Sequence, residues 1–496
     1  MKKTIEQTFL NRDWRLDNLY SIVDKQAKRI TFKRNAIQKS ISDCSNKRKM
    51  ILKARQFGVS TGCLIEQFDY TITNRNVTSV ILAHEQDSIK KLFRIPRRAY
   101  NYLDNSFKPV LDRGGGSKHE LYFPLLNSRI YCDLESRGDT IHNLHISEMA
   151  FIKEPERVLA TLQAVPLDGV VTIETTANGM GNLYYDMWTD AEQPYAKLFF
   201  PWFMFPEYRI GVESLELRDE ELEFKAKILK NFSIDLTDQQ FAYRRYKQKE
   251  LGKLFLQEYP EDDQTCFLSS GGAAIDLFKV KAMQDSHRPV LREDGNIKIY
   301  TEYDRRRKYA VGVDCAEGVE GDSSVAVVFD AHTREQVACL RSASLKPYQF
   351  AEEIHRLCRL YWTEGRLWPL LAVERNNHGH AVLLELNHHI QYPNLFHREI
   401  DAFEHKYDDQ PGWVTDKITR PLMIDTFIEG LENNSLKLND LTTLQECLTL
   451  VNEEGKIQAA TGKHDDCIIA CAIAIQMCIE CASLSVYDDM QASIRI

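Results

Sequence analysis

The chain has 496 residues, of which 43% are hydrophobic and 27% are charged, and its formal net charge is −9. This length is too great for one hydrophobic core and predicts two to four domains of roughly 100–200 residues each. The acidic net charge excludes a chain that is basic throughout, so nucleic-acid binding would depend on local basic clusters such as 25–34, 90–98 and 304–308.

The sequence predicts a protein that does not enter membranes. The amino-terminal stretch lacks the apolar core of a signal peptide. The most apolar run, 467–482, is shorter than the roughly 20 residues of a membrane-spanning helix and contains Gln476 and Glu480. We therefore expect a buried helix there. The 12 cysteines are scattered, which favours reduced core residues.

The first half of the chain alternates short β-branched runs with helical patterns. Strands are expected at 50–54, 77–83, 128–134, 143–147 and 169–176. Continuous apolar strands separated by helices predict a parallel sheet covered on both faces. These elements predict an α/β domain over 1–265, with a charged helical subregion at about 205–265. A Gly/Ser-rich stretch then predicts a linker at 266–300.

The second half repeats the alternation and predicts another α/β domain over 301–485, followed by a tail at 486–496. Residues 309–316 and 324–330 are expected to form a hairpin, and a third strand follows at 336–344. The remaining expected elements are an amphipathic helix at 349–362, a strand at 367–374, a helical segment at 419–433 and the final apolar helix.

KARQFGVSTG, residues 53–62, has the pattern of a phosphate-binding loop between a strand and a helix. Free backbone N–H groups and the helix dipole favour a phosphate at such a helix start. Val59 replaces the usual lysine, so positive charge has to come from Lys53 or Arg55. Ser60 or Thr61 can offer a hydroxyl to Mg²⁺. An ordinary strand–turn–helix connection is the alternative.

Two further segments fit an ATPase. The apolar strand at 144–148 ends in Glu148, the candidate base that orients water toward a γ-phosphate, whereas Ser147 occupies the place of the expected first acid. The strand in 172–182 ends in polar residues that can sense a γ-phosphate. A surface turn is the alternative, because Asn-Gly is a strong turn dipeptide. The residues concerned are Thr175, Thr176, Asn178 and Gly179.

A second constellation consists of carboxylates. Asp314 lies in an apolar strand, where a charge is costly unless it is paired or bound to metal. Glu374 ends another apolar strand, and Asp465 and Asp466 begin the last apolar helix. Carboxylates from two strands and a helix predict a site for two Mg²⁺ or Mn²⁺ ions about 3.5–4 Å apart, which activate water against a phosphodiester.

In order and spacing, these motifs resemble the large subunit of tailed-bacteriophage terminase from about residue 18 to about residue 476. The resemblance implies an N-terminal RecA/ASCE-type P-loop ATPase domain with a parallel-rich sheet and a C-terminal RNase H-like nuclease domain. The variant Walker A motif of that family matches Arg55, Gln56, Gly58, Ser60 and Thr61. Its Walker B motif matches Ser147 and Glu148, and its coupling motif matches Thr175, Thr176, Asn178 and Gly179.

The resemblance assigns further roles. Gln38 is expected to contact adenine, and Arg137 is a candidate arginine finger offered to a neighbouring subunit, with Arg129 as the alternative. Asp314, Glu374 and one aspartate of the 465–466 pair occupy the family's metal positions. We favour Asp466 as the direct ligand, because Asp465 also suits a helix cap. The accessory candidates are Asp322, for which a plain turn is the favoured reading, and Asn376, Asn377 and His378 along the DNA path.

The resemblance implies ATP-driven translocation of double-stranded DNA into a procapsid and cutting of concatemeric DNA. Its cofactors would be Mg²⁺-ATP and Mg²⁺ or Mn²⁺, and its partners a small terminase subunit, a portal protein and copies of itself, usually in a pentamer, in the host cytoplasm. One alternative, a helicase-nuclease, lacks a visible second RecA-like domain between 201 and 304. The other is a structural DNA-binding protein with inactive remnants, suggested by the missing lysine and aspartate and opposed by the intact carboxylates.

Overall fold

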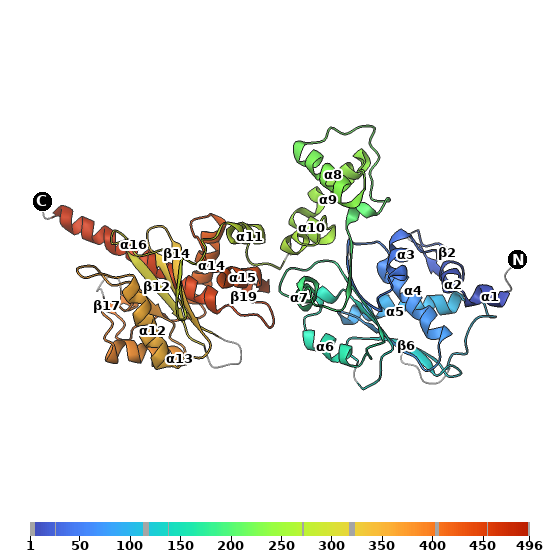
Figure 1. Ribbon diagram of the computed structural model, residues 1–496, viewed down its shortest axis with the longest axis horizontal. Helices are drawn as coiled ribbons and strands as arrows, with labels where there is room; N and C mark the ends of the chain where they lie inside the picture. Colours follow the sequence, from blue (N-terminus) through green and yellow to red (C-terminus); the bar gives the residue numbers. More distant parts are fainter. Residues whose placement is uncertain are drawn as a thin grey trace. The chain divides into compact units, whose positions relative to one another are not determined.

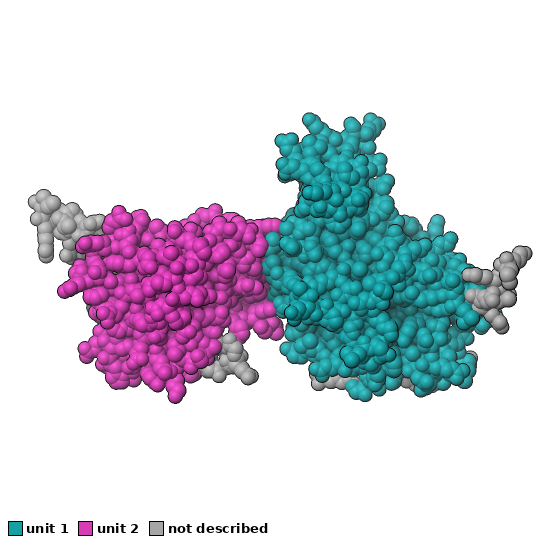
Figure 2. Space-filling view, in the orientation of Figure 1, with its two compact units in different colours: residues 1–271 teal, residues 272–496 magenta. Residues whose placement is uncertain are grey.

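The computed structural model describes residues 5–24, 26–112, 119–136, 138–269, 272–316, 323–401, 406–453 and 455–494. The chain divides into two compact units, Met1–Gly271 and Gly272–Ile496, which Figure 2 shows in separate colours. Within the described residues, no helix is long and apolar enough to cross a membrane. All twelve cysteines are unpaired, and eleven of them are buried, as expected for core residues.

Unit 1 is built around a seven-stranded sheet (Figure 1). Its strands in chain order are β3 (Arg48–Lys53), β4 (Thr78–Leu82), β5 (Glu120–Phe123), β6 (Ser128–Asp133), β7 (Asn143–Ser147), β8 (Val170–Thr175) and β9 (Ala196–Phe200). Across the sheet they run β5-β6-β4-β7-β8-β3-β9, and every neighbouring pair except β5 and β6 is parallel. The insertion of β8 between β3 and β7 is the order of an ASCE-type P-loop fold, so the predicted fold class is confirmed.

Helices cover both faces of this sheet. The connections after β3 and β4 form α4 (Val59–Thr73) and α5 (Gln86–Tyr102), which bury apolar side chains on one face. The connections after β7 and β8 form α6 (Pro155–Gln163) and α7 (Leu183–Thr189), which cover the other. Because the carboxyl ends of parallel strands meet at one edge, the segments after β3, β7 and β8 converge there.

A helical group stands beside the sheet in Figure 1 and consists of α8 (Asp219–Phe232), α9 (Asp238–Leu251) and α10 (Phe255–Glu258). It shares a core with α3 and β3, in which Phe241 is fully buried together with Ile51. The remaining elements of unit 1 are α1 (Ile5–Leu10), α2 (Arg12–Asn18), α3 (Ala36–Asp43) and the hairpin of β1 (Ser21–Val23) with β2 (Arg29–Thr31).

Unit 2 contains a six-stranded sheet. Its strands are β10 (Arg292–Asp294), β11 (Ile297–Ile299), β12 (Tyr309–Asp314), β13 (Ser324–Asp330), β14 (Glu335–Ser342) and β15 (Leu370–Val373), in the order β10-β11-β14-β13-β12-β15. All neighbours are antiparallel except β12 and β15. The expected hairpin, the third strand and the strand at 367–374 are therefore confirmed, and β15 pairs with β12 in the parallel direction.

The helices of unit 2 also lie on both sides of its sheet. The α12 and α13 helices share a core with β12, β13 and β15, whereas α16 packs on β12 and β13. The helices are α11 (Leu277–Ser286), α12 (Pro347–Leu360), α13 (Asn377–Leu384), α14 (Thr419–Glu432), α15 (Leu441–Leu448) and α16 (Asp466–Ile494). Two small strand pairs join β16 (Glu399–Asp401) to β17 (Lys406–Tyr407) and β18 (Leu450–Glu453) to β19 (Lys456–Ala459).

Gly312 lets α16 approach β12 closely. A Cβ atom on Gly312 would lie 2.2 Å from the carbonyl oxygen of Ala470 and 2.3 Å from the backbone nitrogen of Ala474. Those are backbone atoms that cannot move aside as a flexible side chain can. A residue without a side chain at 312 therefore allows the second and third turns of α16 to pack directly on β12.

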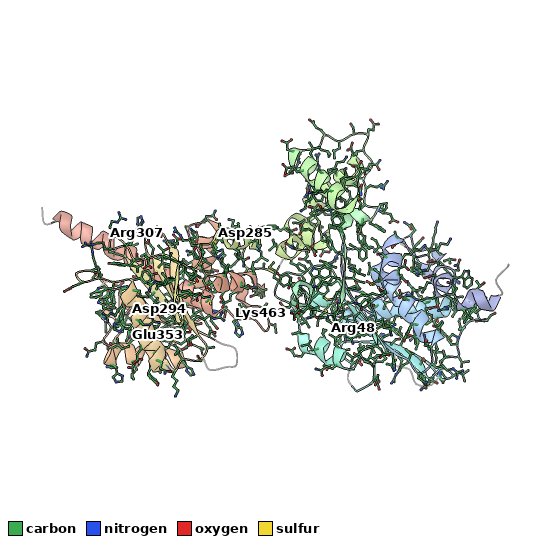
Figure 3. All side chains as sticks on the ribbon, viewed as in Figure 1. Arg48, Asp285, Asp294, Arg307, Glu353 and Lys463 are labelled. Carbon is green, nitrogen blue, oxygen red and sulfur yellow. The ribbon has the colours of Figure 1, made fainter. Side chains whose placement is uncertain are left out.

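Most of the segment 266–300, expected to be a linker, instead forms part of unit 2. Burial alternates along β11, where Ile297 and Ile299 are buried and Lys298 is exposed. Arg356 on α12 holds the edge strand through an ion pair of 2.6 Å with Asp294, and it also pairs at 2.6 Å with Glu353 of its own helix; both acids are labelled in Figure 3. Strand pairing thus extends the sheet beyond the Gly/Ser-rich residues from which the linker was predicted.

Candidate functional site

The phosphate loop lies between β3 and α4, as the sequence predicts. Gly58 precedes the first residue of α4 with a φ of 70°, and no side chain caps the helix there. Gln56 also has a positive φ, of 62°. The uncapped first turn leaves backbone N–H groups available to an anion. A cavity of about 520 Å³ opens in front of it, lined by Lys53, Arg55, Gln56, Phe57, Gly58, Val59, Ser60, Thr61, His84, Lys91, Glu148 and Phe151.

Lys53, at the end of β3, lies between two glutamates. Its Nζ is 3.0 Å from Oε1 of Glu148 and 2.9 Å from Oε2 of Glu174, and its side chain is almost fully buried. Burial alone would lower the pKa of Lys53, but the two carboxylates outweigh burial and raise that pKa above its ordinary value. Lys53 is therefore a permanent cation inside the cavity wall, which is the charge that Val59 cannot supply.

Arg55 connects the phosphate loop to the helical group. Its guanidinium pairs with Glu258 at the end of α10, and its backbone N–H donates to the Glu258 carbonyl at 3.0 Å. The hydroxyl of Tyr208 donates to the Arg55 carbonyl. The other candidate cation of the loop thus already has a carboxylate partner, and the loop is held by two contacts with Glu258 of α10 and one with Tyr208.

Glu148 follows β7 in a left-handed conformation, with φ of 53° and ψ of 48°. Its backbone N–H donates to the Glu174 carbonyl at 2.7 Å, and its carboxylate accepts from the Thr176 backbone at 3.2 Å and the Thr175 hydroxyl at 3.4 Å. The predicted base therefore faces the cavity while two residues of the predicted coupling segment hold it. A change in that segment would move the base directly.

The other residues of the coupling segment support the same turn. Asn178 donates to the Ala150 carbonyl at 2.9 Å, and the Gly179 carbonyl accepts from Asn182 at 3.1 Å. The segment after β8 is thus joined to the segment after β7. The roles of Asn178 and Gly179 remain predictions.

Gln38 packs on the phosphate loop. Its amide accepts from the Asn35 backbone at 2.9 Å and donates to the Gly58 carbonyl at 2.7 Å. Both polar atoms have partners within the chain, so a contact with adenine would require the amide to turn. Arg137 lies outside the described residues, and the alternative, Arg129, pairs with Asp139 at 2.9 Å. Both assignments remain predictions.

The sequence analysis missed Glu174. This carboxylate is fully buried in β8, where Oε1 accepts from the Ser60 hydroxyl at 2.7 Å and from the Ser147 hydroxyl at 2.9 Å. Burial opposes ionisation, but Lys53, the nearby His145 ring and the hydrogen bond from Ser60 outweigh it and hold the pKa of Glu174 below its ordinary value. An acid inside an apolar strand was the available signal. His84 and Lys91, which also line the cavity, carry no comparable signal in the sequence.

In unit 2, the predicted acids come together at the end of β12. Asp314 ends that strand, Glu374 follows the parallel neighbour β15, and Asp466 begins α16. Burial raises the pKa of Asp314 well above its usual value, and a hydrogen bond with Glu374 and the charges of Glu374, Asp466 and Asp465 add to the effect. Four negative groups thus lie close enough for one of them to retain a proton.

The two adjacent aspartates have different surroundings. Asp465 pairs with Arg420 of α14 at 3.1 Å, whereas Oδ2 of Asp466 accepts from the Ser323 backbone at 2.9 Å. The cap of α16 comes from another residue that the sequence analysis missed, because Glu446 on α15 accepts from the backbones of Cys467 and Ile468 at 2.9 Å and 3.2 Å. The arginine partner of Asp465 agrees with the preference for Asp466 as the direct ligand, which remains a prediction.

Asn376 holds Glu374. Its Nδ2 donates to Oε2 of Glu374 at 3.2 Å and to the Cys315 carbonyl at 3.0 Å, and its Oδ1 accepts from the Gly379 backbone at 2.7 Å. Asn376 therefore links the ends of β12 and β15 while it caps α13. Asp322 and the side chain of Asn377 lie outside the described part of the chain. The role of His378 along the DNA path remains a prediction.

The donor types suit hard divalent cations, because carboxylates from three elements lie close enough to influence one another. Among the described residues, no group of three or more His, Cys, Asp and Glu side chains is arranged to hold a metal ion. Asp314 instead shares a hydrogen bond with Glu374, and Asp466 is held by the Ser323 backbone. A cation would have to replace that shared proton.

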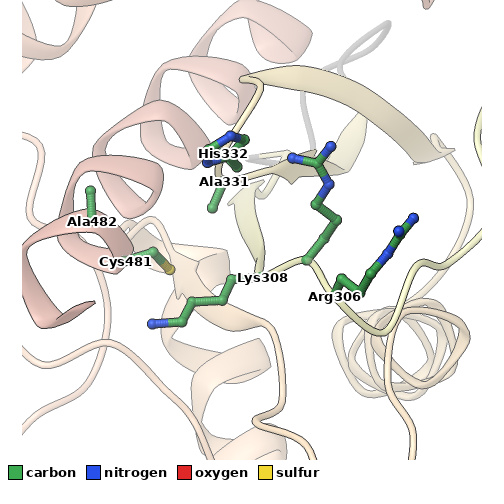
Figure 4. Close-up of a pocket in the computed structure, with 7 residues that line it drawn as sticks. Arg306, Lys308, Ala331, His332, Cys481 and Ala482 are labelled. Carbon is green, nitrogen blue, oxygen red and sulfur yellow. The ribbon is translucent and has the colours of Figure 1, made fainter. Parts of the chain in front are cut away.

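A second pocket, of about 560 Å³, lies at the opposite end of β12 (Figure 4). It is lined by Arg306, Arg307, Lys308, Ala331, His332, Cys481 and Ala482. Arg306 pairs with Asp304 at 2.7 Å, and Arg307 pairs with Asp330 at 3.6 Å. The basic cluster expected at 304–308 is therefore partly neutralised and separate from the acids.

No protein-family model and no curated protein matches the chain. Among solved structures, the chain is similar to the HK97 bacteriophage large terminase, with 10% identity, 94% of this chain and 99% of that chain covered, and a TM-score of 0.47. It is also similar to the large terminase nuclease from thermophilic phage G20c, with 18% identity, 40% of this chain and 97% of that chain covered, and a TM-score of 0.30. A third similar structure is the Thermus phage P74-26 large terminase ATPase domain, with 16% identity, 47% of this chain and 94% of that chain covered, and a TM-score of 0.33. Identities and TM-scores this low do not by themselves assign a function, which has to come from the chain's own sites.

Proposed function

We propose that this chain is the large subunit of a tailed-bacteriophage terminase, with ATPase and endonuclease activities. The observation that carries the proposal is the presence of two unlike sites in one chain. In unit 1, Lys53 of the phosphate loop pairs with Glu148 beside the cavity. In unit 2, acids at the ends of β12 and β15 and at the start of α16 lie near one another. A motor that also cuts its DNA track requires this combination.

For the ATPase step, the first turn of α4 would bind phosphate oxygens through its N–H groups, and Lys53 would neutralise their charge. Ser60 or Thr61 would offer a hydroxyl to the Mg²⁺ that accompanies ATP and spreads the developing charge. Glu148 would then accept a proton from the attacking water. Its contacts with Thr175 and Thr176 would pass the state of the nucleotide to the segment after β8.

For the nuclease step, Asp314, Glu374 and Asp466 would hold Mg²⁺ or Mn²⁺, with Asp465 nearby. Two such ions supply an activated water and stabilise the leaving oxygen of a phosphodiester. Asn376 would keep Glu374 oriented during this step through the hydrogen bond between them. Double-stranded DNA is the expected substrate.

The same proposal includes the finer expectations from the family resemblance. These are translocation into a procapsid, cutting of concatemeric DNA, a small terminase subunit and a portal protein as partners, a pentamer on the portal, and action in the host cytoplasm. Arg137 would serve a neighbouring subunit in that ring.

Two observations disfavour the alternatives. A helicase-nuclease would need a second RecA-like sheet, but within the described ranges the second large sheet is mostly antiparallel. A structural protein with inactive remnants would have no reason to keep Lys53 buried between two acids or Asp314 buried beside Glu374, since unneeded buried charges destabilise a fold.

Cleavage of supercoiled plasmid by the purified chain tests the proposal, with Mn²⁺, Mg²⁺ or EDTA and with Asp314→Asn. Metal-dependent cutting that the variant lacks is the expected result. ATP-driven packaging of DNA into procapsids tests the translocation half. Folded protein that neither cuts in any metal nor hydrolyses ATP, alone or with procapsids, would overturn the proposal.

A further inference from the structure

The end of β7 lacks a carboxylate at the position where a P-loop enzyme usually holds its nucleotide-bound cation. Ser147 stands there, and a neutral hydroxyl offers no charge to a divalent ion. The neighbouring strand provides one, because the register of β7 and β8 places Glu174 beside Ser147. The register of β3 and β8 places the same residue beside Ile51, two residues before Lys53. Glu174 thus sits between the phosphate loop and the strand that lacks an acid.

The hydrogen bonds of Glu174 point to a specific task. Its Oε1 accepts the hydroxyl hydrogen of Ser60 at 2.7 Å and that of Ser147 at 2.9 Å. A serine hydroxyl has one hydrogen and two lone pairs. When Ser60 gives its hydrogen to Glu174 beneath the loop, both of its lone pairs remain for the cavity, which Ser60 lines. That orientation is the one a hydroxyl needs to bind a cation.

Pairing with Lys53 alone does not explain Glu174. Lys53 already has Glu148 at 3.0 Å, so a second, fully buried carboxylate is not needed to neutralise it. Some buried polar atoms beside Glu174 also lack hydrogen-bond partners among the described residues. The buried His145 ring has its Nε2 3.7 Å from Oε1 of Glu174, and neither of its nitrogens has a hydrogen-bond partner in the described part of the chain. Burying polar groups without hydrogen-bond partners destabilises the fold, and a ligand-binding role would explain why these groups are kept.

We propose that Glu174 is the carboxylate of the magnesium–nucleotide site and acts through Ser60. It orients the Ser60 hydroxyl toward the cation and supplies from β8 the negative charge that Ser147 does not supply from β7. Glu174 is a positioning residue in this arrangement, whereas Glu148, which lines the cavity, remains the base. The inference rests on the proposed ATPase function and assigns different tasks to the two glutamates that share Lys53.

The test measures the affinity of the full chain for a fluorescent ATP analogue, once in EDTA and once in Mg²⁺. The wild type should bind more tightly with Mg²⁺. Glu174→Gln should reduce that gain roughly 10- to 100-fold, the usual cost of removing a carboxylate that supports a metal ligand, and should bind as the wild type does in EDTA. Glu221→Gln is the matched control, since it changes another buried glutamate of unit 1, one that pairs with Arg245 away from the cavity, and should keep the full gain.

Ser147→Asp combined with Glu174→Gln returns a carboxylate to β7 and should restore most of the Mg²⁺ gain, which a purely structural role of Glu174 would not produce. If Glu174→Gln does not fold, Glu174→Asp replaces it, because a shorter side chain withdraws the carboxylate from Ser60. An undiminished gain in a folded Glu174 variant would overturn this inference and leave the ATPase proposal intact. A wild type that binds no nucleotide in either buffer would overturn both.

Discussion

Lys53 and Glu148 form an ion pair with 3.0 Å between Nζ and Oε1, so the cation of the phosphate loop directly holds the candidate base. Lys53 ends β3 and Glu148 directly follows β7, and β8 lies between these two strands in the sheet. A phosphate in the cavity would compete with Glu148 for Lys53. The ion pair thus offers a physical way for nucleotide arrival to release the base toward water.

Glu148→Gln should abolish hydrolysis and leave nucleotide binding in place. The amide cannot accept a proton from water, and loss of a general base costs roughly 100- to 10,000-fold in rate. Phosphate release and binding of a fluorescent ATP analogue measure the two effects separately. Unaltered turnover would remove Glu148 from the role of base.

Lys53→Ala should weaken ATP binding more than Val59→Ala does, because the cavity's buried cation comes from position 53. It should also destabilise unit 1, since it leaves Glu174 buried without its cation. Breaking a buried pair in this way typically costs about 3–5 kcal/mol. Nucleotide titration and thermal unfolding of both variants check the prediction. The opposite order of affinities would mean that the loop is aligned wrongly with the Walker A pattern.

Asp314→Asn should stop DNA cutting while it preserves or raises the thermal stability of unit 2 in EDTA. The variant removes the acid whose pKa is raised by burial and by the neighbouring Glu374, Asp466 and Asp465, so it relieves both the burial cost and the repulsion. Activity should fall by more than roughly 100-fold, because supporting groups alone contribute 10- to 100-fold at metal sites. Asp330→Asn, which changes a buried aspartate of the same sheet that pairs with Arg307, is the control and should keep nuclease activity. A drop in stability with cutting preserved would make Asp314 a structural residue.

Glu446→Gln should make stability less dependent on pH. Burial raises the pKa of Glu446 to about 7 from an ordinary value of 4.5, and repulsion from Asp466 adds to this. Because the pKa of Glu446 is higher in the folded than in the unfolded protein, the group stabilises the fold fully below about pH 4.5. This contribution to the free energy of unfolding is lost as the pH rises through 7. The difference corresponds to roughly 3 kcal/mol. The glutamine variant should therefore match the wild type near pH 4.5 and melt at a higher temperature at pH 8, both measured in EDTA. Equal melting temperatures at pH 8 would contradict the assignment.

Gly312→Ala should destabilise unit 2 and lower nuclease activity. Its Cβ would meet backbone atoms of α16 at 2.2 and 2.3 Å, and overpacking of this kind costs about 1–3 kcal/mol or more. Gly211→Ala is the matched control, because nothing lies within 4 Å of a Cβ at that glycine. Thermal unfolding and plasmid cleavage of the two variants should differ. Equal behaviour would show that α16 can move away from β12 at no cost.

The central strands of both sheets could be predicted from the sequence because their apolar runs are local signals. The edge strands β5 and β9 were missed, since each is short and only part of its residues are buried. The predicted linker was wrong for a related reason, because β11 acquires its strand character from pairing with β14, and β10 from pairing with β11.

The acids of unit 2 could be predicted because a charge in an apolar strand is conspicuous, and Asp314 was identified on that ground. Glu174 has the same signal but stands within a segment that was interpreted through its threonines. The pairing of Arg55 with Glu258 could not be predicted, because it depends on how α10 folds back on the phosphate loop. Such contacts arise from tertiary packing and leave no periodic trace in the chain.

In the proposed nuclease, the close packing of α16 on Gly312 would fix how far α16 can shift along β12. A shift of α16 by one residue relative to β12 would move its side chains by about 1.5 Å along the helix axis. That is a large fraction of the separation of about 3.5–4 Å between the ions of a two-metal site. Ala470, which touches Gly312, lies one helical turn after Asp466. The spacing of the proposed metal ligands would therefore depend on Gly312, a residue without a side chain that packs one helical turn away from Asp466.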